Sequence, residues 1–250
     1  MKKLVLVFLA VLFSFNIGYS QVKHNVDKFI SEDEYEKWKS ENKNFSGNLK
    51  IEHNDSTFEI VPFTEGVING TVKKYYNRKS LESEITYDNG KLVGVQTVYY
   101  KSGSVKSVYP IKNQNINGLG EEFYENGVKK AQTKYKNGKK HGLEILYYTN
   151  GNKGSEIHYK NDVKNGDYKH YFSNGALKST GKYKKDKING KTSIYYENGK
   201  LFSYVIYVDG KAVEGICADT RVWTEAELSN WNSGIEVSCN NNDDAFYFKK

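Results

Sequence analysis

The sequence has little of what characterises a disulfide-rich scaffold, an integral membrane protein or an enzyme. Only two of its 250 residues are cysteines, Cys217 and Cys239, which is too few for a disulfide framework. After the first twenty residues, no segment offers the roughly 20 predominantly apolar residues that a membrane span requires. No Gly-x-Ser-x-Gly, paired-carboxylate or Cys/His nucleophile pattern is present. We therefore expect no catalytic residues and no enzyme activity.

Histidine is also scarce, and its positions do not favour a metal site. The five histidines are His24, His53, His141, His158 and His170. Convergent ligands would be needed to hold a metal ion. The last three histidines occupy different positions in the sequence repeat, so no column of imidazoles lines up, and the cysteines are distant in sequence. We expect no metal and no cofactor.

The first twenty residues have the pattern of a signal peptide. Lys2 and Lys3 form a basic start, residues 4–15 are almost wholly apolar, and residues 18–20 place small residues where a signal peptidase cleaves. This predicts an exported protein that begins at Gln21. A retained membrane anchor is the alternative, although the apolar run is short for a span. No cysteine follows the run, so a lipoprotein would lack its acceptor residue.

Export changes the interpretation of the two cysteines. In an oxidising compartment, an isolated cysteine pair near one terminus is typical of a disulfide. A Cys217–Cys239 bond would close a loop of about 20 residues, for which the chain-entropy model gives about 3 kcal/mol of stabilisation. Two unpaired thiols remain the alternative.

Tyrosine and glycine are abundant, and both recur with a period of 24 residues. The repeat glycines are Gly70, Gly94, Gly118, Gly142, Gly166 and Gly190. Five and six residues after each glycine stands an aromatic pair: Tyr75-Tyr76, Tyr99-Tyr100, Phe123-Tyr124, Tyr147-Tyr148, Tyr171-Phe172 and Tyr195-Tyr196. A fixed period of roughly 20 to 50 residues indicates a repeat architecture, which usually presents an extended binding surface.

Each repeat has the pattern of two strands and two turns. Four repeats place Asn-Gly after the aromatic pair, which predicts a hairpin because both residues accept positive φ. A second turn follows in most repeats, as in Asn89-Gly90 and Asn137-Gly138. The thirteenth residue after each glycine is small and the seventeenth is usually tyrosine. Period-2 alternation puts these two columns on one face of the sheet.

The flanking segments are expected to cap the array. Ser31 and Glu34 form a capping box for a short helix over residues 31–40, and Thr224 and Glu227 form a second one near the other end. A degenerate repeat is predicted between Gly47 and Asn69, since terminal repeats are usually atypical. The expected divisions are a signal peptide at 1–20, an N-terminal cap at 21–69, six repeats at 70–213 and a C-terminal cap at 214–250.

Charge is divided between the array and its ends. Residues 70–213 carry 26 Lys/Arg against 13 Asp/Glu, whereas residues 21–69 and 214–250 each carry a net charge of −4. A basic surface suggests an anionic partner, such as an acidic protein, anionic lipid or cell-wall polymer. The alternative is that exposed lysines only prevent edge-to-edge aggregation of strands.

The repeat pattern resembles a known family. Tyr-Tyr-x-Asn-Gly followed by Tyr-x-Asn-Gly at a period of 24, best seen in residues 190–201, is similar to the bacterial MORN-repeat variant. Within it, the pattern looks like the YwqK-type proteins, an antitoxin-like family. The resemblance covers residues 70–213 and implies an elongated all-β array of hairpins that associates with proteins or membranes. Choline-binding cell-wall repeats are less similar, because those depend on tryptophan and none of the six repeats contains one.

The aromatic pairs provide the candidate binding surface. Adjacent residues of a strand point to opposite faces, so one ring of each pair should face inward and the other outward. The candidate binding face comprises Tyr75, Tyr99, Phe123, Tyr147, Tyr171 and Tyr195. We expect a non-catalytic protein-binding module, for which the resemblance suggests a toxin as partner. The alternative is anionic lipid or cell-wall polymer held by a basic aromatic face; export argues against nucleic acid.

Overall fold

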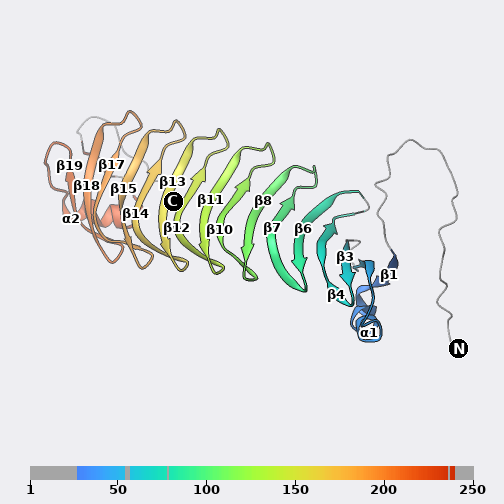
Figure 1. The fold of residues 1–250 in the computed structure, drawn as a ribbon. Coiled ribbons are helices and arrows are strands. Elements are labelled where there is room, and N and C mark those ends of the chain that lie inside the picture. The colour runs from blue at the N-terminus through green and yellow to red at the C-terminus, as the bar shows by residue number, and fades with distance from the viewer. Residues whose placement is uncertain (1–26, 54–56, 78, 236, 240–250) are drawn as a thin grey trace.

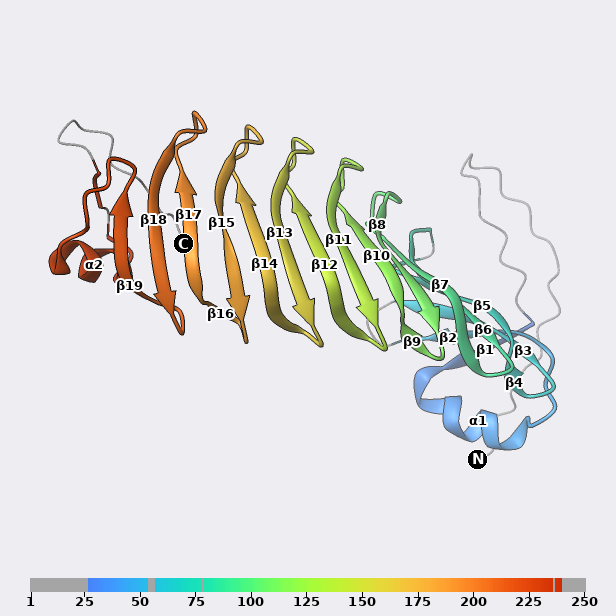
Figure 2. The same ribbon diagram turned by 60° about the vertical axis from the view of Figure 1, so that its left-hand side comes forward.

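The computed structural model describes residues 27–53, 57–77, 79–235 and 237–239. The signal peptide predicted at residues 1–20 lies outside these ranges. The described residues form one long, twisted sheet of 19 strands with a short helix at each end (Figures 1 and 2). The prediction of an elongated all-β array is confirmed.

The helices are few and the strands are short. The helical segments are η1 (Glu32–Glu34), α1 (Tyr35–Glu41) and α2 (Glu225–Asn232). The strands before the repeats are β1 (Lys28–Ser31), β2 (Gly47–Glu52) and β3 (Phe58–Thr64). The strands of the first three repeats are β4 (Val67–Ile68), β5 (Gly70–Tyr75), β6 (Leu81–Asp88), β7 (Lys91–Tyr99), β8 (Val105–Lys112), β9 (Asn115–Ile116), β10 (Gly118–Phe123) and β11 (Lys129–Lys136). The remaining strands are β12 (Lys139–Tyr147), β13 (Lys153–Lys160), β14 (Val163–Tyr171), β15 (Leu177–Lys184), β16 (Lys187–Ile188), β17 (Gly190–Tyr195), β18 (Leu201–Val208) and β19 (Lys211–Cys217).

The sheet is an antiparallel meander in sequence order. From β2 onward successive strands pair with each other, except that β4 and β5, β9 and β10, and β16 and β17 are pieces of one interrupted strand. These pieces pair with β3, β8 and β15 respectively. The one parallel pair joins β1 to β2. The sheet therefore exceeds the six predicted hairpins at both ends, and β19 extends past the boundary expected at residue 213.

The two kinds of turn differ in conformation. At the second turn of each repeat, both central residues have positive φ, as at Asn137 (51°) and Gly138 (79°). At the first turn only the glycine does, for example Gly127 at 82°. The prediction that both residues of the first Asn-Gly take positive φ is wrong. Instead Asn126 accepts a hydrogen bond from the Val128 backbone through its side chain, an Asx turn next to a β-bulge.

The strand register divides side chains between two faces. One face carries the small column and the late tyrosines, which therefore share a face as predicted; five of the six small residues are buried. We call it the capped face, because both terminal helices contribute to clusters on it. The other, which we call the open face, carries the first aromatic residue of each pair. Among the described residues, no helix or second sheet covers the open face.

The N-terminal cap forms largely as expected. The capping box between Ser31 and Glu34 is present and leads through η1 into α1. Trp38 of α1 is buried and packs on Leu49 and Phe63 of β2 and β3. The helix was predicted to dock on the first edge of the array. It lies instead on the capped face, because β1 already occupies that edge.

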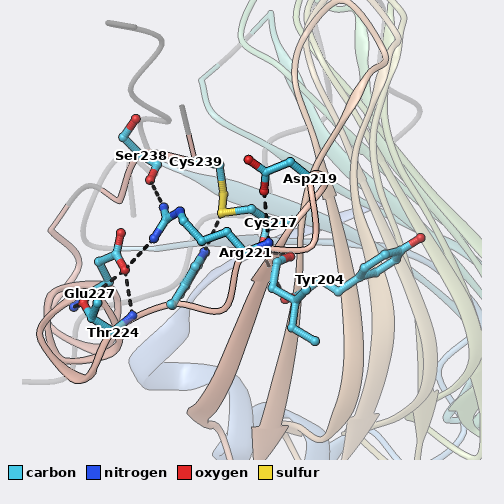
Figure 3. The surroundings of a disulfide bond; sticks show 11 residues. Tyr204, Cys217, Asp219, Arg221, Thr224, Glu227, Ser238 and Cys239 are labelled. Atoms are coloured by element: carbon cyan, nitrogen blue, oxygen red, sulfur yellow. Dashed lines mark hydrogen bonds and ion pairs between the residues drawn. A yellow bond between two sulfur atoms is a disulfide. The ribbon is translucent and has the colours of Figure 1, made fainter. Parts of the chain in front are cut away.

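The C-terminal cap is held by a disulfide and a second capping box. Cys217 at the end of β19 is bonded to Cys239, with Cα atoms 5.5 Å apart (Figure 3), so the disulfide prediction is confirmed. Thr224 and Glu227 form the predicted capping box of α2, and Glu227 also pairs with Arg221. Among the described helices, none is long and apolar enough to cross a membrane.

Candidate binding surfaces

The six predicted aromatic residues lie in one column of the open face, joined by contacts between repeats. The Tyr99 hydroxyl donates to the Glu84 carboxylate at 2.9 Å, and the Tyr147 hydroxyl donates to Gln132 Oε1 at 2.8 Å. In both cases the acceptor belongs to the preceding repeat. The column therefore connects neighbouring hairpins as well as lining a surface.

One member of this column is buried, although a binding face requires accessible side chains. Tyr75 is only 7% exposed because its ring stacks on Phe58 of the degenerate repeat, with ring centroids 4.7 Å apart. Tyr75 is therefore a packing residue at the N-terminal end. The other five rings are half-buried and keep one part of their surface accessible.

Aliphatic side chains extend this surface in the second and third repeats. Val95 and Leu119 occupy equivalent positions on the open face and are 45% and 46% exposed. Pro110 of the neighbouring strand pairs with Val95 and lies beside Gly118. These residues flank Tyr99 and Phe123 and form an apolar centre, which we call the apolar patch.

Four lysines of the open face have acidic neighbours, whereas Lys134 and Lys169, which are exposed on the same face, belong to no ion pair among the described residues. Lys129 contacts Glu121 at 2.8 Å and Lys153 contacts Glu156 at 2.6 Å, while Lys73 and Lys182 also have acidic partners. The Lys129 and Gln132 side chains hold the pKa of Glu121 below its usual value. These four pairs reduce the positive field of the open face without removing it.

The second aromatic of each pair has a structural role on the capped face. Four tyrosine hydroxyls donate to the carbonyl of the first aromatic in the next repeat, at 2.7 to 3.0 Å. The donors are Tyr76, Tyr100, Tyr124 and Tyr148. This answers which ring of each pair lines the uncovered face: it is the first.

The capped face becomes polar in the middle of the array. Lys140 contacts Glu144, which is buried and also accepts a hydrogen bond from Thr133. Tyr109 donates to Glu122 at 2.8 Å, and burial together with this carboxylate raises the pKa of the phenol. These groups satisfy one another within the sheet, so they support the fold.

The excess lysines gather at one edge of the sheet, where the second turns lie. Each of the six second turns supplies at least one exposed lysine. These residues are Lys91, Lys112, Lys136, Lys139, Lys160, Lys184, Lys185, Lys187 and Lys211. We call them the lysine edge. Sequence reasoning missed it because it compared charge by segment and not by position within the 24-residue period.

Comparison with known families matches the same repeats. The model described as the MORN repeat variant matches residues 68–89, 92–113, 116–137, 140–161, 164–185 and 188–209. Together the six matches cover just over half of the chain. The chain belongs to the MORN repeat variant family. Each MORN match starts near the beginning of the first strand of its repeat, two residues before the repeat glycine.

Other comparisons add little to the MORN assignment. No curated protein matches the chain, and nothing supports the finer likeness to YwqK-type antitoxins. One similar solved structure is titled "Crystal structure of GtfA/B complex bound to UDP and GlcNAc". It is 16% identical, with coverage of 52% of this chain and 23% of that chain and a TM-score of 0.21. That likeness is too weak to carry an argument.

The described part of the MORN array offers no cluster suited to metal binding. Within it, no three His, Cys, Asp or Glu side chains lie close enough to hold a metal ion. His158 contacts the backbone carbonyl of Asp167, and His170 lies against Tyr168. Burial lowers the pKa of His170. The arrangement of the described residues is thus one of extended surfaces.

Proposed function

We propose that this MORN protein is a non-catalytic binding module that holds a protein partner on its open face. The observation that carries the proposal is the apolar patch, in which Val95 and Leu119 occupy equivalent positions in adjacent repeats, with β8 between their strands, and are nearly half exposed. Large apolar side chains gathered on an uncovered surface are typical of interaction sites. The half-buried rings of Tyr99 and Phe123 extend the patch with rigid contact area.

Two close ion pairs favour a protein partner over an anionic surface for this face. Lys129 and Lys153 are engaged with acidic side chains on the same face. A polyanion or membrane would have to displace those carboxylates. A protein interface instead needs an apolar centre with a polar rim, which is the arrangement around Leu119.

We further propose that the protein works outside the cytoplasm. The Cys217–Cys239 disulfide supports this, because disulfides persist in oxidising compartments, as does the signal-like pattern of the first twenty residues. A toxin is the class of partner suggested by the resemblance to YwqK-type proteins. An immunity role in the cell envelope would fit that resemblance.

Site-specific cross-linking in the producing cells tests the proposal. A photoreactive residue in place of Leu119 should capture one discrete protein. The same residue in place of Lys101, which is exposed on the first-turn edge, should not capture it. A Val95→Lys change should weaken capture at position 119 by disrupting the apolar patch. No cross-link at 119, or equal cross-linking at both positions, would contradict binding by the open face.

A further inference from the structure

We propose that the lysine edge binds a linear, flexible polyanion, independently of the protein partner proposed for the open face. The edge is the row formed by the second turns, and every one of the six turns contributes to it. These turns follow one another along a single side of the sheet (Figures 1 and 2). The proposal rests on the charge, spacing and shape of this row.

The lysines of the edge are free of acidic partners. No ion pair among the described residues includes any of the nine, whereas four lysines of the open face, Lys73, Lys129, Lys153 and Lys182, have acidic partners. All nine are exposed. Unpaired ammonium groups at hairpin tips repel one another, so a bound chain of negative charge relieves that repulsion.

Aspartates in the same turns do not cancel this charge. Four lie there, Asp88, Asp162, Asp186 and Asp209. Asp162 and Asp186 are committed to the fold, because each accepts a hydrogen bond from a backbone N–H of the preceding turn, at Lys140 and Lys164, both at 2.8 Å. The edge therefore keeps a clear positive excess along its length.

The opposite edge, formed by the first turns, has a smaller basic excess. The fourth and fifth first turns, at residues 148–152 and 172–176, contain no charged residue. The other first turns contain four basic residues, Arg78, Lys79, Lys101 and Lys200, and two glutamates, Glu125 and Glu197, against nine lysines and four aspartates in the second turns. Protection against edge pairing explains lysines on terminal strands, but the turns of an internal meander have no free strand edge to protect.

The shape of the lysine edge suits a flexible polyanion better than a flat membrane surface. Adjacent strands lie about 4.8 Å apart, so successive second turns are about 10 Å apart and the row from Lys91 to Lys211 spans about 50 Å. The sheet twists along its length, and the strands near its N-terminal end run in a different direction from those near its C-terminal end (Figure 2). A flexible chain can follow the rotating row, whereas a flat membrane meets only part of it.

Binding of inorganic polyphosphate to the intact protein tests the proposal. We expect affinity to rise steeply from tripolyphosphate to chains long enough to follow the whole edge, and then to level off, because each turn adds a contact on one linked ligand. Affinity should also fall as salt is raised, through release of counterions. Affinity that is independent of chain length would overturn the proposal.

A matched pair of variants distinguishes the effect of the lysine edge from the effect of total charge. The edge variant carries Lys→Gln at positions 136, 139, 160, 184 and 187. The control variant carries Lys→Gln at five exposed positions elsewhere, 101, 130, 134, 169 and 200. Both lose the same charge. We expect the edge variant to bind long polyphosphate about tenfold or more weaker, with a shallower salt dependence, and the control to change within about twofold.

Two further outcomes would contradict binding of a linear polyanion by the lysine edge. Equal weakening in both variants would show non-specific attraction to a basic protein. Binding to vesicles with anionic headgroups, without binding to long polyphosphate, would assign the lysines to a membrane surface. Neither result bears on cross-linking at Leu119, so failure of this proposal and failure of the proposed protein-binding function are distinguishable.

Discussion

At the residue scale, the aromatic pairs show how one motif serves two faces. The first ring, as in Tyr147, reaches back to the preceding repeat on the open face. The second ring, as in Tyr124, reaches forward to the next repeat on the capped face. The pairs Tyr99-Tyr100 and Tyr147-Tyr148 thus each connect a hairpin to both of its neighbours. This explains why tyrosine is favoured over phenylalanine in a single-layer sheet: its ring packs while its hydroxyl bonds.

The second aromatic column provides its own internal comparison. Tyr124→Phe removes the hydroxyl that donates to the Tyr147 carbonyl, and we expect the free energy of unfolding to fall by about 1 kcal/mol. The equivalent residue of the fifth repeat is already phenylalanine, so Phe172→Tyr introduces the missing hydroxyl and should raise stability by a similar or smaller amount. Urea unfolding followed by circular dichroism measures both. Unchanged midpoints in both variants would show that this hydrogen bond contributes nothing.

At the element scale, the C-terminal cap closes the last strand of the sheet. The Ala212 N–H in β19 donates to Asn232 Oδ1 at 2.9 Å, and Asn232 Nδ2 donates to the Ala212 carbonyl at 3.0 Å. Further along the same strand, the Trp223 backbone donates to the Gly215 carbonyl. The Trp223 ring also occupies the space above Gly215, where a Cβ would lie 2.1 Å from it. Helix α2 and residues 221–223 therefore act in place of a further strand.

Removing this cover should expose a pairing edge. Asn232→Ala leaves the backbone groups of Ala212 without their partners, and we expect a loss of about 1 to 2 kcal/mol together with self-association at raised concentration. Sedimentation velocity measures the association and urea unfolding the stability. Ser229→Ala, an exposed change in the same helix, is the control. Monomeric behaviour of both variants at all concentrations would show that α2 does not protect the edge.

At the scale of the whole molecule, stability depends on many half-buried tyrosines and on no thick core. Buried apolar clusters form at the two ends, around Trp38 and Trp223, whereas the middle of the array relies on rings spread over small residues. Burial raises the pKa of the phenols along the array, among them Tyr135, Tyr168 and Tyr207. Ionisation of these rings is therefore coupled to unfolding.

This coupling determines whether the free energy of unfolding rises or falls with pH. A phenol whose pKa is higher in the folded than in the unfolded chain stabilises the fold fully below the unfolded value of about 10, and that stabilisation declines as pH rises above it. We expect the urea midpoint to be lower at pH 11 than at pH 8. In a pH titration, the absorbance of tyrosinate should appear at a higher pH in the native protein than in the urea-unfolded chain. Identical titration of both states would contradict coupling of phenol burial to folding.

Much of the architecture could be predicted because it is local. The 24-residue period, the turn residues and the two capping boxes at Ser31 and Thr224 each act over a few neighbouring positions. The conformation of the first turn was missed because the Asn126 side chain and a β-bulge, not the dipeptide alone, set it. The burial of Tyr75 was missed because it depends on Phe58, a residue of a different and irregular hairpin.

The sequence by itself determined the repeat, the strand and turn order, the sharing of one face by the small column and the late tyrosines, and the cysteine pair, since these follow from periodicity and from the short-range preferences of the chain. Only the tertiary structure decided which ring of each pair lines the uncovered face and that both caps lie on the opposite face. It also decided that the second-turn lysines gather along one edge, while some lysines of the open face, such as Lys129, pair with acids. The physical reason is that exposure and charge compensation depend on neighbours one repeat away across the sheet. Such neighbours meet only once the strands have paired in register.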